Sequence, residues 1–379
     1  MSFVLSEEQS AIQASARKLV EERAPIGLLR RLRDTRDESG FSRESWGDLA
    51  ASGYVGILLP EALGGAGLGY AELGLVLEAL GRTLAPTPFL STVLLAGNAL
   101  LFAGSEAQQR AILPGIAAGE RIVGFAHEEG RAHAPYRVET RAERCGDGFR
   151  ISGEKGMVLD GHVADTLVVV ARSSGNRGDR EGLSLFLVPA NAPGVTVTRM
   201  HLVDSRNAAR VRFDGVLAGE SDAIGVIGGG AAILDRVLDR ATVGLAAEML
   251  GGLSEAFDRT VAYLKVRKQF GVAIGSFQAL KHRAALMFCE VELCRSLVMD
   301  ALRAADEDRA DLPQLASAAK ARVSDAFLLI SGEAVQMHGG VGVTDELDIG
   351  FFLKRARVAE MTLGTAAFHR DRFARLQGY

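Results

Sequence analysis

The chain has 379 residues, of which 48% are hydrophobic, and a formal net charge of -4 with a pI near 6.0. This length can bury a large core and allows two or three domains of roughly 150 residues each. The small acidic excess excludes the concentrated basic face that nucleic-acid binding requires. We therefore expect an ordinary globular protein with no nucleic-acid partner.

The three cysteines, Cys145, Cys289 and Cys294, have no CxxC spacing. Cys289 and Cys294 are five residues apart in a helical pattern and point away from each other, which favours reduced, buried thiols over a disulfide or a metal site. The start of the chain lacks a basic segment followed by a long apolar one, and about 18 apolar residues never run together. These features predict a cytoplasmic protein without a metal or a membrane partner.

The first third of the chain has helical periodicity. Ser6 and Gln9 have the spacing of a capping box, and apolar residues follow at helical intervals. Further helices are expected over residues 71–84 and 106–118. The segment 60–69 between them holds four glycines and one proline and must be a loop. We predict an N-terminal α-helical domain over residues 1–120.

Short β-rich runs replace the helical pattern after about residue 120. They lie at 121–125, 149–152, 166–172, 183–188, 195–198 and 211–213. Turn clusters separate them, so the spacing predicts an antiparallel β-domain, a sandwich or a barrel, over residues 121–226. Helical periodicity then returns, and a C-terminal four-helix bundle is predicted over residues 227–379.

Four motifs occur in a fixed order: Pro60–Gly65, Arg267–Gln278, Gln336–Gly340 and Gly364–Thr365. With the order of an α-domain, a β-domain and an α-bundle, they resemble the acyl-CoA dehydrogenase family along essentially the whole chain. The resemblance implies a mainly α fold with a β insert, with FAD bound between the β-domain and the bundle. It also implies tetramers built from dimers, an acyl-CoA substrate and electron-transferring flavoprotein as electron acceptor.

Arg267 and Phe270 have flavin-binding chemistry. They are three residues apart and are expected to share a helix face that ends at Gly271. A guanidinium beside a ring can hold a pyrophosphate while the ring covers an adenine or flavin edge. A basic residue that caps a helix C-terminus has the same pattern. By resemblance, the pair reaches the FAD of the neighbouring subunit.

Gln336 is expected in the last turn of a helix that stops at Gly339 and Gly340, where backbone amides can approach a ligand. A plain helix stop explains the two glycines equally well. By resemblance, Gln336 and Gly340 also contact the partner's FAD, whereas Gly364 and Thr365 contact the subunit's own. The predicted cofactor-binding residues are Arg267, Phe270, Gln278, Gln336, Gly339, Gly340 and Thr365.

The catalytic base is missing from both places where the resemblance implies it. Acyl-CoA dehydrogenation takes a proton from the α-carbon while the β-hydrogen leaves as hydride to the flavin, so a carboxylate is needed. The positions of this glutamate are Leu363 and Ala241 here. Glu248 lies about 10 Å beyond Ala241 along a helix. Glu360 precedes Leu363 by one turn beside Arg357, a spacing typical of a solvated ion pair.

The resemblance also implies a weakened site for the subunit's own flavin. Residues 127–133 read His-Glu-Glu-Gly-Arg-Ala-His in place of a Thr-Glu-Pro-Gly-x-Gly-Ser-Asp type loop. Met157 and Leu159 replace the tryptophan and the threonine of a Trp-Ile-Thr-Asn type strand. His127 and His133 could act in catalysis, but loop histidines without a placed partner are more often solvated.

These losses predict the base-less subunit of a heteromeric α2β2 acyl-CoA dehydrogenase of lipid or steroid catabolism. An alternative is a homomeric flavoenzyme with a relocated base, Glu360 or Glu248, or with different oxidation chemistry. A non-enzymatic, DNA-associated descendant is disfavoured because it needs a basic surface. Small residues at Ala241, Gly244 and Gly251 would either widen a pocket for a bulky thioester or allow close helix packing.

Overall fold

The computed structural model describes residues 4–379, which divide into two compact units. The helical unit contains the described residues up to Arg31, residues 70–85 and residues 242–379. The sheet unit contains residues 32–69 and 86–241. The N-terminal third of the chain is therefore shared between the units. The domain borders near residues 120 and 226 stay predictions.

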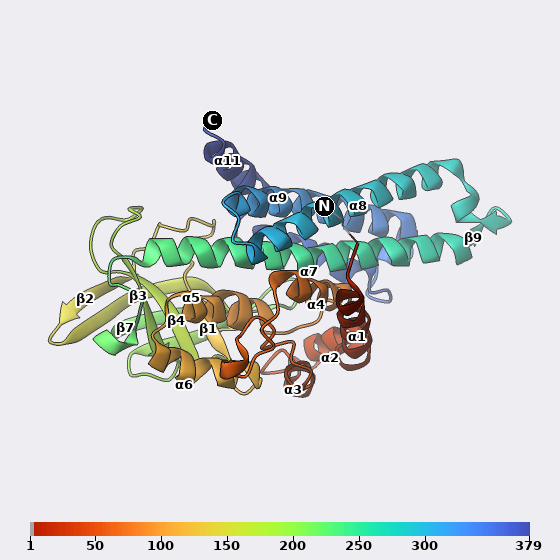
Figure 1. The fold of residues 1–379 in the computed structure, drawn as a ribbon. Helices are drawn as coiled ribbons and strands as arrows, with labels where there is room; N and C mark the ends of the chain where they lie inside the picture. Colours follow the sequence, from red (N-terminus) through yellow and green to blue (C-terminus); the bar gives the residue numbers. More distant parts are fainter. Residues whose placement is uncertain (1–3) are drawn as a thin grey trace. The chain divides into compact units, whose positions relative to one another are not determined.

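The helical unit is built from long helices (Figure 1). They are α1 (Glu7–Arg23), α2 (Ile26–Asp34, in its first turns), α4 (Tyr70–Arg82), α7 (Gly230–Val266, from Thr242 onward), α8 (Gln278–Asp306), α9 (Leu312–His338), α10 (Ile349–Met361) and α11 (Ala366–Leu376). α9 packs against α8, α10 and α11. The helical C-terminal region that the sequence predicts is confirmed.

Local sequence signals position these helices. α1 begins at the predicted capping box, where Gln9 N donates to Ser6 Oγ at 3.1 Å and Ser6 N donates to Gln9 Oε1 at 3.2 Å. α4 and α7 approach closely at a glycine, because a Cβ at Gly251 would lie 2.0 Å from the Glu78 carbonyl oxygen. Gly251 therefore allows close helix packing and does not widen a pocket.

The sheet unit contains one eight-stranded sheet, with the order β6-β7-β3-β2-β4-β5-β8 and β1 paired to β4 (Figure 1). The strands are β1 (Val123–Ala126), β2 (Arg141–Cys145), β3 (Gly148–Leu159), β4 (Thr166–Arg172), β5 (Leu183–Pro189), β6 (Val195–His201), β7 (Asn207–Gly219) and β8 (Ala223–Ile224). Most neighbouring strands are antiparallel, as predicted, but β1 and β2 run parallel to β4. β2 was not predicted, because only Ala142 of that strand is buried and its charged neighbours resemble a loop.

Short helices flank the strands in the sheet unit. They are α3 (Arg43–Ala51), the π-helix η2 (Phe89–Gly97), α5 (Asn98–Ala103) and α6 (Glu106–Ala117). Thr92 of η2 bonds both backbone groups of Val123 in β1 at 3.2 Å. The sheet core includes Phe149 and Phe186, whose ring centroids are 5.1 Å apart. Buried aromatic side chains thus hold the strands together.

The three cysteines differ in burial. All three cysteines are free, but only Cys294 is buried, so the prediction of buried thiols is wrong for Cys145 and Cys289. Burial raises the pKa of the Cys294 thiol to about 12.

Within residues 4–379, no helix is long and apolar enough to cross a membrane. The same residues contain no group of three His, Cys, Asp or Glu side chains placed to hold a metal ion.

Candidate functional site

The segment with Arg267 and Phe270 is a β-hairpin. α7 ends before Arg267, and β9 (Lys268–Gln269) pairs in antiparallel fashion with β10 (Val272–Ala273). Phe270 and Gly271 connect the strands with φ angles of +54° and +81°, as both central residues of a type I′ turn require. The predicted shared helix face is therefore wrong, because strand pairing replaces the helix and Gly271 supplies a turn.

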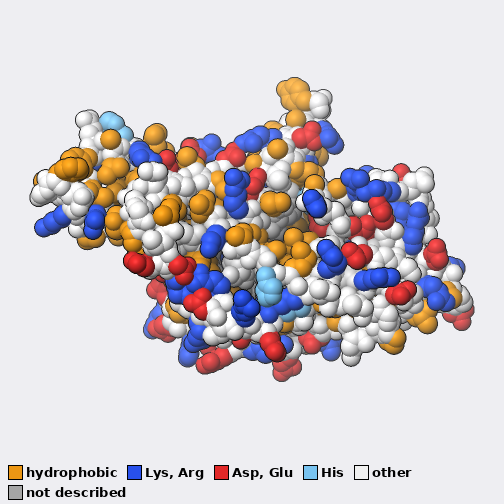
Figure 2. Space-filling model, turned by 180° about the vertical axis from the view of Figure 1, so that it is seen from behind, with side chains coloured by type: hydrophobic (Ala, Val, Ile, Leu, Met, Phe, Trp, Pro, Cys, Tyr) orange, Lys and Arg blue, Asp and Glu red, His pale blue; other side chains and the backbone are white. Residues whose placement is uncertain are grey.

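The hairpin presents its apolar side chains to solvent. Phe270 is 91% exposed, and Val272 and Phe277 are also exposed. Figure 2 shows hydrophobic side chains gathered at the end of the helical unit that the hairpin occupies. A left-handed conformation costs a residue with a Cβ about 1–2 kcal/mol. A strained and exposed phenylalanine indicates a contact that forms with a ligand or a partner.

The C-terminal end of α9 is the second predicted flavin-binding segment. The helix ends at His338, and Gly339 caps it with φ of +66° and ψ of -147°, its N–H donating to the Gln336 carbonyl. The predicted helix stop is confirmed. Gln336, Gly339 and Gly340 are exposed, and a Cβ added at either glycine would meet no atom within 4 Å. A ligand can therefore reach the backbone here.

Tyr263 of α7 brings the two segments together. Its ring stacks on the His338 ring with 4.3 Å between centroids, and its hydroxyl donates to the His338 carbonyl at 3.3 Å. The Tyr263 carbonyl accepts the N–H of Arg267 at 2.9 Å. We call the resulting surface the hairpin face; it consists of Arg267, Phe270, Gln336, Gly339 and Gly340.

Two further residues lie on the helices that flank the hairpin. Gln278, another predicted cofactor contact, is the exposed first residue of α8. Tyr263 was not among the predicted site residues. Its place one helical turn before Arg267 was the only signal in the sequence, because stacking on His338 depends on how α7 and α9 pack.

The turn with Leu363 and Thr365 belongs to the helical unit and is bonded from inside. Leu363 is 8% exposed and has φ of +56°. Its carbonyl accepts a hydrogen bond from His369 Nε2 at 2.9 Å. Thr365 caps α11, with Oγ1 accepting the N–H of Phe368 at 3.2 Å, and its hydroxyl proton remains for a second contact. The turn therefore holds Leu363 in a strained and defined conformation.

Lys320 of α9 is the buried cation behind this turn. It is 0% exposed, and its Nζ donates to the carbonyls of Glu360 and Gly364, both at 2.9 Å, and to Ser324 Oγ at 3.3 Å. Three acceptors match the three donors of an ammonium group, while burial lowers its pKa to about 7. Lys320 was not among the predicted site residues. The only sequence feature that could have indicated its burial is its place as a single lysine among small residues.

Both alternative bases are paired with arginines. Glu360 Oε2 is 3.6 Å from Arg357 Nη1, which confirms the predicted pair, but the Glu360 side chain is 18% exposed and thus largely buried. Glu248 Oε1 is 3.2 Å from Nη1 of the buried Arg355. The prediction of a solvated Glu360 is wrong because α10 packs against α9, where Lys320 Nζ bonds the Glu360 carbonyl.

Residues 127–140 of the sheet unit form a loop that bonds to itself, which we call the histidine loop. His127 is buried, and its Nε2 donates to the Pro135 carbonyl at 2.8 Å. His133 Nδ1 bonds to Glu128 Oε1, and the His133 side chain is 6% exposed. The prediction of solvated histidines is wrong, because each ring finds an acceptor within the loop.

Glu129 joins the histidine loop to β3. Its Oε1 accepts from Lys155 Nζ and from Thr140 Oγ1, both at 2.7 Å. Lys155 is 0% exposed and also donates to the His127 carbonyl at 3.1 Å. Burial opposes ionisation of Glu129, but the Lys155 charge and these hydrogen bonds lower its pKa. Lys155 and Glu129 therefore form a largely buried ion pair that connects the loop to β3.

A cavity of about 630 Å³ borders the histidine loop. Carboxylates and guanidinium groups line it, among them Glu128, Glu129, Arg131, Arg137 and Arg177. A flavin ring needs mainly apolar walls. On β3, Met157 is 36% exposed and Leu159 is buried without a hydroxyl. The histidine loop and these β3 residues do not fit a flavin ring.

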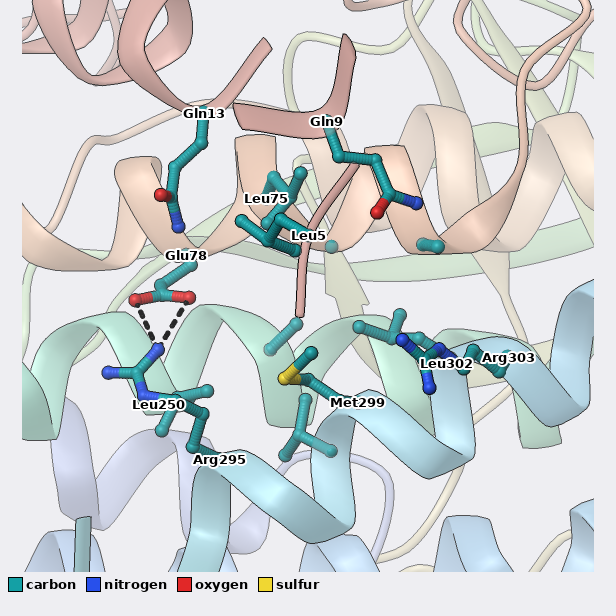
Figure 3. A pocket seen from close by; sticks show the side chains of 14 residues that line it. Leu5, Gln9, Gln13, Leu75, Glu78, Leu250, Arg295, Met299, Leu302 and Arg303 are labelled. Atoms are coloured by element: carbon teal, nitrogen blue, oxygen red, sulfur yellow. Dashed lines mark hydrogen bonds and ion pairs between the residues drawn. The ribbon is translucent and has the colours of Figure 1, made fainter. Parts of the chain in front are cut away.

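A smaller cavity of about 150 Å³ lies in the helical unit among α1, α4, α7 and α8 (Figure 3). Glu78 forms one wall and accepts hydrogen bonds from Arg295 at 3.0 and 3.2 Å. Leu5 and Met299 extend toward its centre. None of the predicted site residues lines this cavity, so it is separate from the hairpin face.

Comparison with known proteins identifies the family. The family models for the N-terminal, middle and C-terminal domains of acyl-CoA dehydrogenase match residues 6–120, 126–216 and 228–377. The acyl-CoA dehydrogenase FadE27 of Mycobacterium tuberculosis is 31% identical over 89% of both chains. The chain belongs to the acyl-CoA dehydrogenase family of oxidoreductases, whose members bind FAD. The predicted family, fold class and cofactor are confirmed at this level.

Two of the similar solved structures are each named after two proteins. The Tcur3481-Tcur3483 steroid ACAD, solved as a variant, is 34% identical with a TM-score of 0.88, and the match covers 98% of each chain. The ChsE4-ChsE5 complex from Mycobacterium tuberculosis is 28% identical with a TM-score of 0.89, covering 100% of this chain and 99% of that chain. Other similar structures contain FAD.

Proposed function

We propose that the chain is a subunit of a heterotetrameric, FAD-dependent acyl-CoA dehydrogenase and completes the flavin site of a related, base-bearing subunit. The observation that carries this proposal is Phe270, a 91% exposed ring in the left-handed turn of the hairpin. The enzyme would desaturate an acyl-CoA thioester between its α- and β-carbons. Electron-transferring flavoprotein is the expected electron acceptor.

Each residue of the hairpin face has a proposed task. Arg267 would hold the pyrophosphate through its guanidinium, and Phe270 would cover an adenine or flavin edge. Gln336 and the open amides at Gly339 and Gly340 would donate hydrogen bonds to the same cofactor. When bound, FAD accepts the hydride that leaves the β-carbon. The partner subunit would supply the carboxylate that removes the α-proton.

The segments that the resemblance assigns to the chain's own flavin support the proposal that this subunit does not use a flavin of its own. A leucine at position 363 cannot accept a proton. The carboxylates Glu128 and Glu129 bond within or beside the histidine loop and are not left for a ligand. The two similar complexes with paired names support a heteromer, one of them a steroid ACAD. A ring-bearing thioester is therefore the first substrate class to test.

Two preparations test this proposal. The chain is purified alone and after co-expression with a related chain that has a glutamate directly before its Gly-Thr. We expect the chain alone to bind little FAD. The co-purified complex should contain one FAD for each pair of unlike subunits, and acyl-CoA should reduce this FAD. Visible absorption and native mass spectrometry measure both. Stoichiometric FAD that acyl-CoA reduces in the chain alone would overturn the proposal.

A homomeric enzyme with Glu360 as base is the second candidate. The largely buried Glu360 side chain, one turn before Leu363, favours it, whereas the ion pair with Arg357 at 3.6 Å opposes it. In such an enzyme Glu360→Gln would abolish flavin reduction by acyl-CoA. Glu248→Gln tests the other acidic candidate in the same assay. In the heteromeric enzyme, Glu360→Gln is expected to leave flavin reduction within about twofold of wild type.

A further inference from the structure

One aromatic pair connects the two segments of the hairpin face. Tyr263 of α7 and His338 of α9 have rings that stack at an interplanar angle of 27°. The Tyr263 hydroxyl donates to the His338 carbonyl, one of the groups that a helix end leaves without an intrahelical partner. The open backbone begins at the next residue, Gly339. The position of the Gly339 backbone therefore depends on Tyr263.

Both members of the pair are fixed by further hydrogen bonds. His338 is 7% exposed, and its Nδ1 donates to the Ala334 carbonyl at 2.7 Å. The Tyr263 carbonyl accepts the N–H of Arg267 at 2.9 Å, and the Arg267 carbonyl accepts the N–H of Ile274 at 2.8 Å across the hairpin. Tyr263 is thus bonded through its backbone to the hairpin and through its side chain to the end of α9.

We propose that Tyr263 is a positioning residue that holds Arg267 and the Gly339 backbone at the separation needed to bind one FAD molecule. A binding surface made of two segments gains affinity when both are held in the bound arrangement beforehand. The inference rests on the proposed function, because it concerns the same hairpin face. It applies equally whether the flavin belongs to a related subunit or to a second copy of the chain.

Titration of FAD into the flavin-free assembled protein tests this role. Tyr263→Phe keeps the stack and removes the hydroxyl, so we expect about three- to tenfold weaker FAD binding. Tyr263→Leu also removes the stack and should weaken binding by about tenfold or more. Phe257→Leu is the matched control, because Phe257 lies on the same helix and its ring pairs with Phe288 of α8 at 6.2 Å. The control should change FAD affinity by less than about twofold, with a comparable decrease in melting temperature.

Arg267→Met separates the two proposals. If it weakens FAD binding while both Tyr263 variants bind like wild type, the positioning role is wrong and the proposed function stands. If Arg267→Met binds FAD as tightly as wild type, the proposed function fails and the positioning role fails with it. Hydrogen exchange gives a readout that does not need flavin. Tyr263→Leu must increase exchange at residues 339–343, and Phe257→Leu must leave it unchanged.

Discussion

The hairpin face and the histidine loop are both segments that the family resemblance associates with flavin, yet their side chains are engaged in opposite ways. The hairpin face exposes Phe270 and leaves the backbone around Gly339 open. In the histidine loop, His127, His133 and Glu129 each bond to a group in the loop or on β3. The first surface is open to solvent, whereas the side chains of the second bond to groups of the same unit.

Residue type alone is therefore a poor guide to a ligand site. Histidines and glutamates are common catalytic residues, but here they stabilise a loop. Phe270 has no reactive group, yet it combines an exposed ring with a strained, left-handed backbone, a combination that is frequent at ligand-binding sites. Exposure and strain therefore separate the two regions better than chemical reactivity does.

The largest expected effect concerns the ion pair behind the histidine loop. Lys155→Met leaves Glu129 largely buried without its cation and should lower the free energy of unfolding by about 3–5 kcal/mol, measured by urea denaturation. Adding Glu129→Gln should recover part of this loss, because the unpaired charge is removed. A loss below about 1 kcal/mol for Lys155→Met would show that the loop is not held from inside, and the contrast with the hairpin face would disappear.

The second effect tests the turn around Leu363 through pH. The pKa of Lys320 is lowered to about 7 in the folded chain, against about 10.4 when unfolded. Between these values the unfolded chain binds a proton that the folded chain has lost, so the free energy of unfolding rises with pH in this window and becomes independent of this group below about pH 7. Wild type should gain about 2 kcal/mol between pH 7 and 9 relative to Lys320→Gln. Parallel pH profiles of the two proteins would contradict the assignment.

The third effect tests whether the open backbone of the hairpin face requires glycine. Gly339→Ala places a Cβ at φ of +66° and ψ of -147°, which should cost about 1–3 kcal/mol of unfolding free energy. Gly332→Ala is the control within α9, where a Cβ meets no atom within 4 Å and should stabilise the helix by about 0.5–1 kcal/mol. Chemical denaturation of both variants compares them. Equal effects would mean that the position after α9 does not require glycine.

The smallest effect on stability separates strain from function at the hairpin tip. Phe270→Asn creates the Asn-Gly pair that type I′ turns prefer and should stabilise the chain by up to about 1 kcal/mol. The same change should weaken FAD binding in the assembled protein by about threefold to tenfold, because the ring is lost. Thermal melts and FAD titrations measure the two effects. Lower stability together with unchanged FAD binding would reverse the interpretation of Phe270.

Local signals in the sequence were sufficient for many elements. The Ser6 capping box, the glycine stop after His338 and the strand at residues 166–172 were predicted and are present. Each depends on groups that are close along the chain, such as a cap side chain and the N–H three residues later. The motif order was likewise sufficient to predict the family, because motif spacing reflects the whole fold.

Errors arose where the chain folds back on itself or where distant segments meet. Arg267 and Phe270 were assigned to a helix because three-residue spacing suits one, but the Phe270-Gly271 turn allows strand pairing instead. The histidines were expected in solvent because their acceptors could not be recognised from residue spacing. Lys320 looked like any lysine on a helix, although it is fully buried.

The family, the cofactor class and the absence of an acidic residue at positions 363 and 241 follow from the sequence, because they depend only on residue identity and order. Which of the predicted residues are available to a ligand depends on the folded chain. Availability depends on which groups fold back to satisfy a donor or an acceptor, as Glu129 does for Lys155, and which are left exposed, as Phe270 is. Burial and hydrogen bonding are set by the packing of segments that are far apart in the chain.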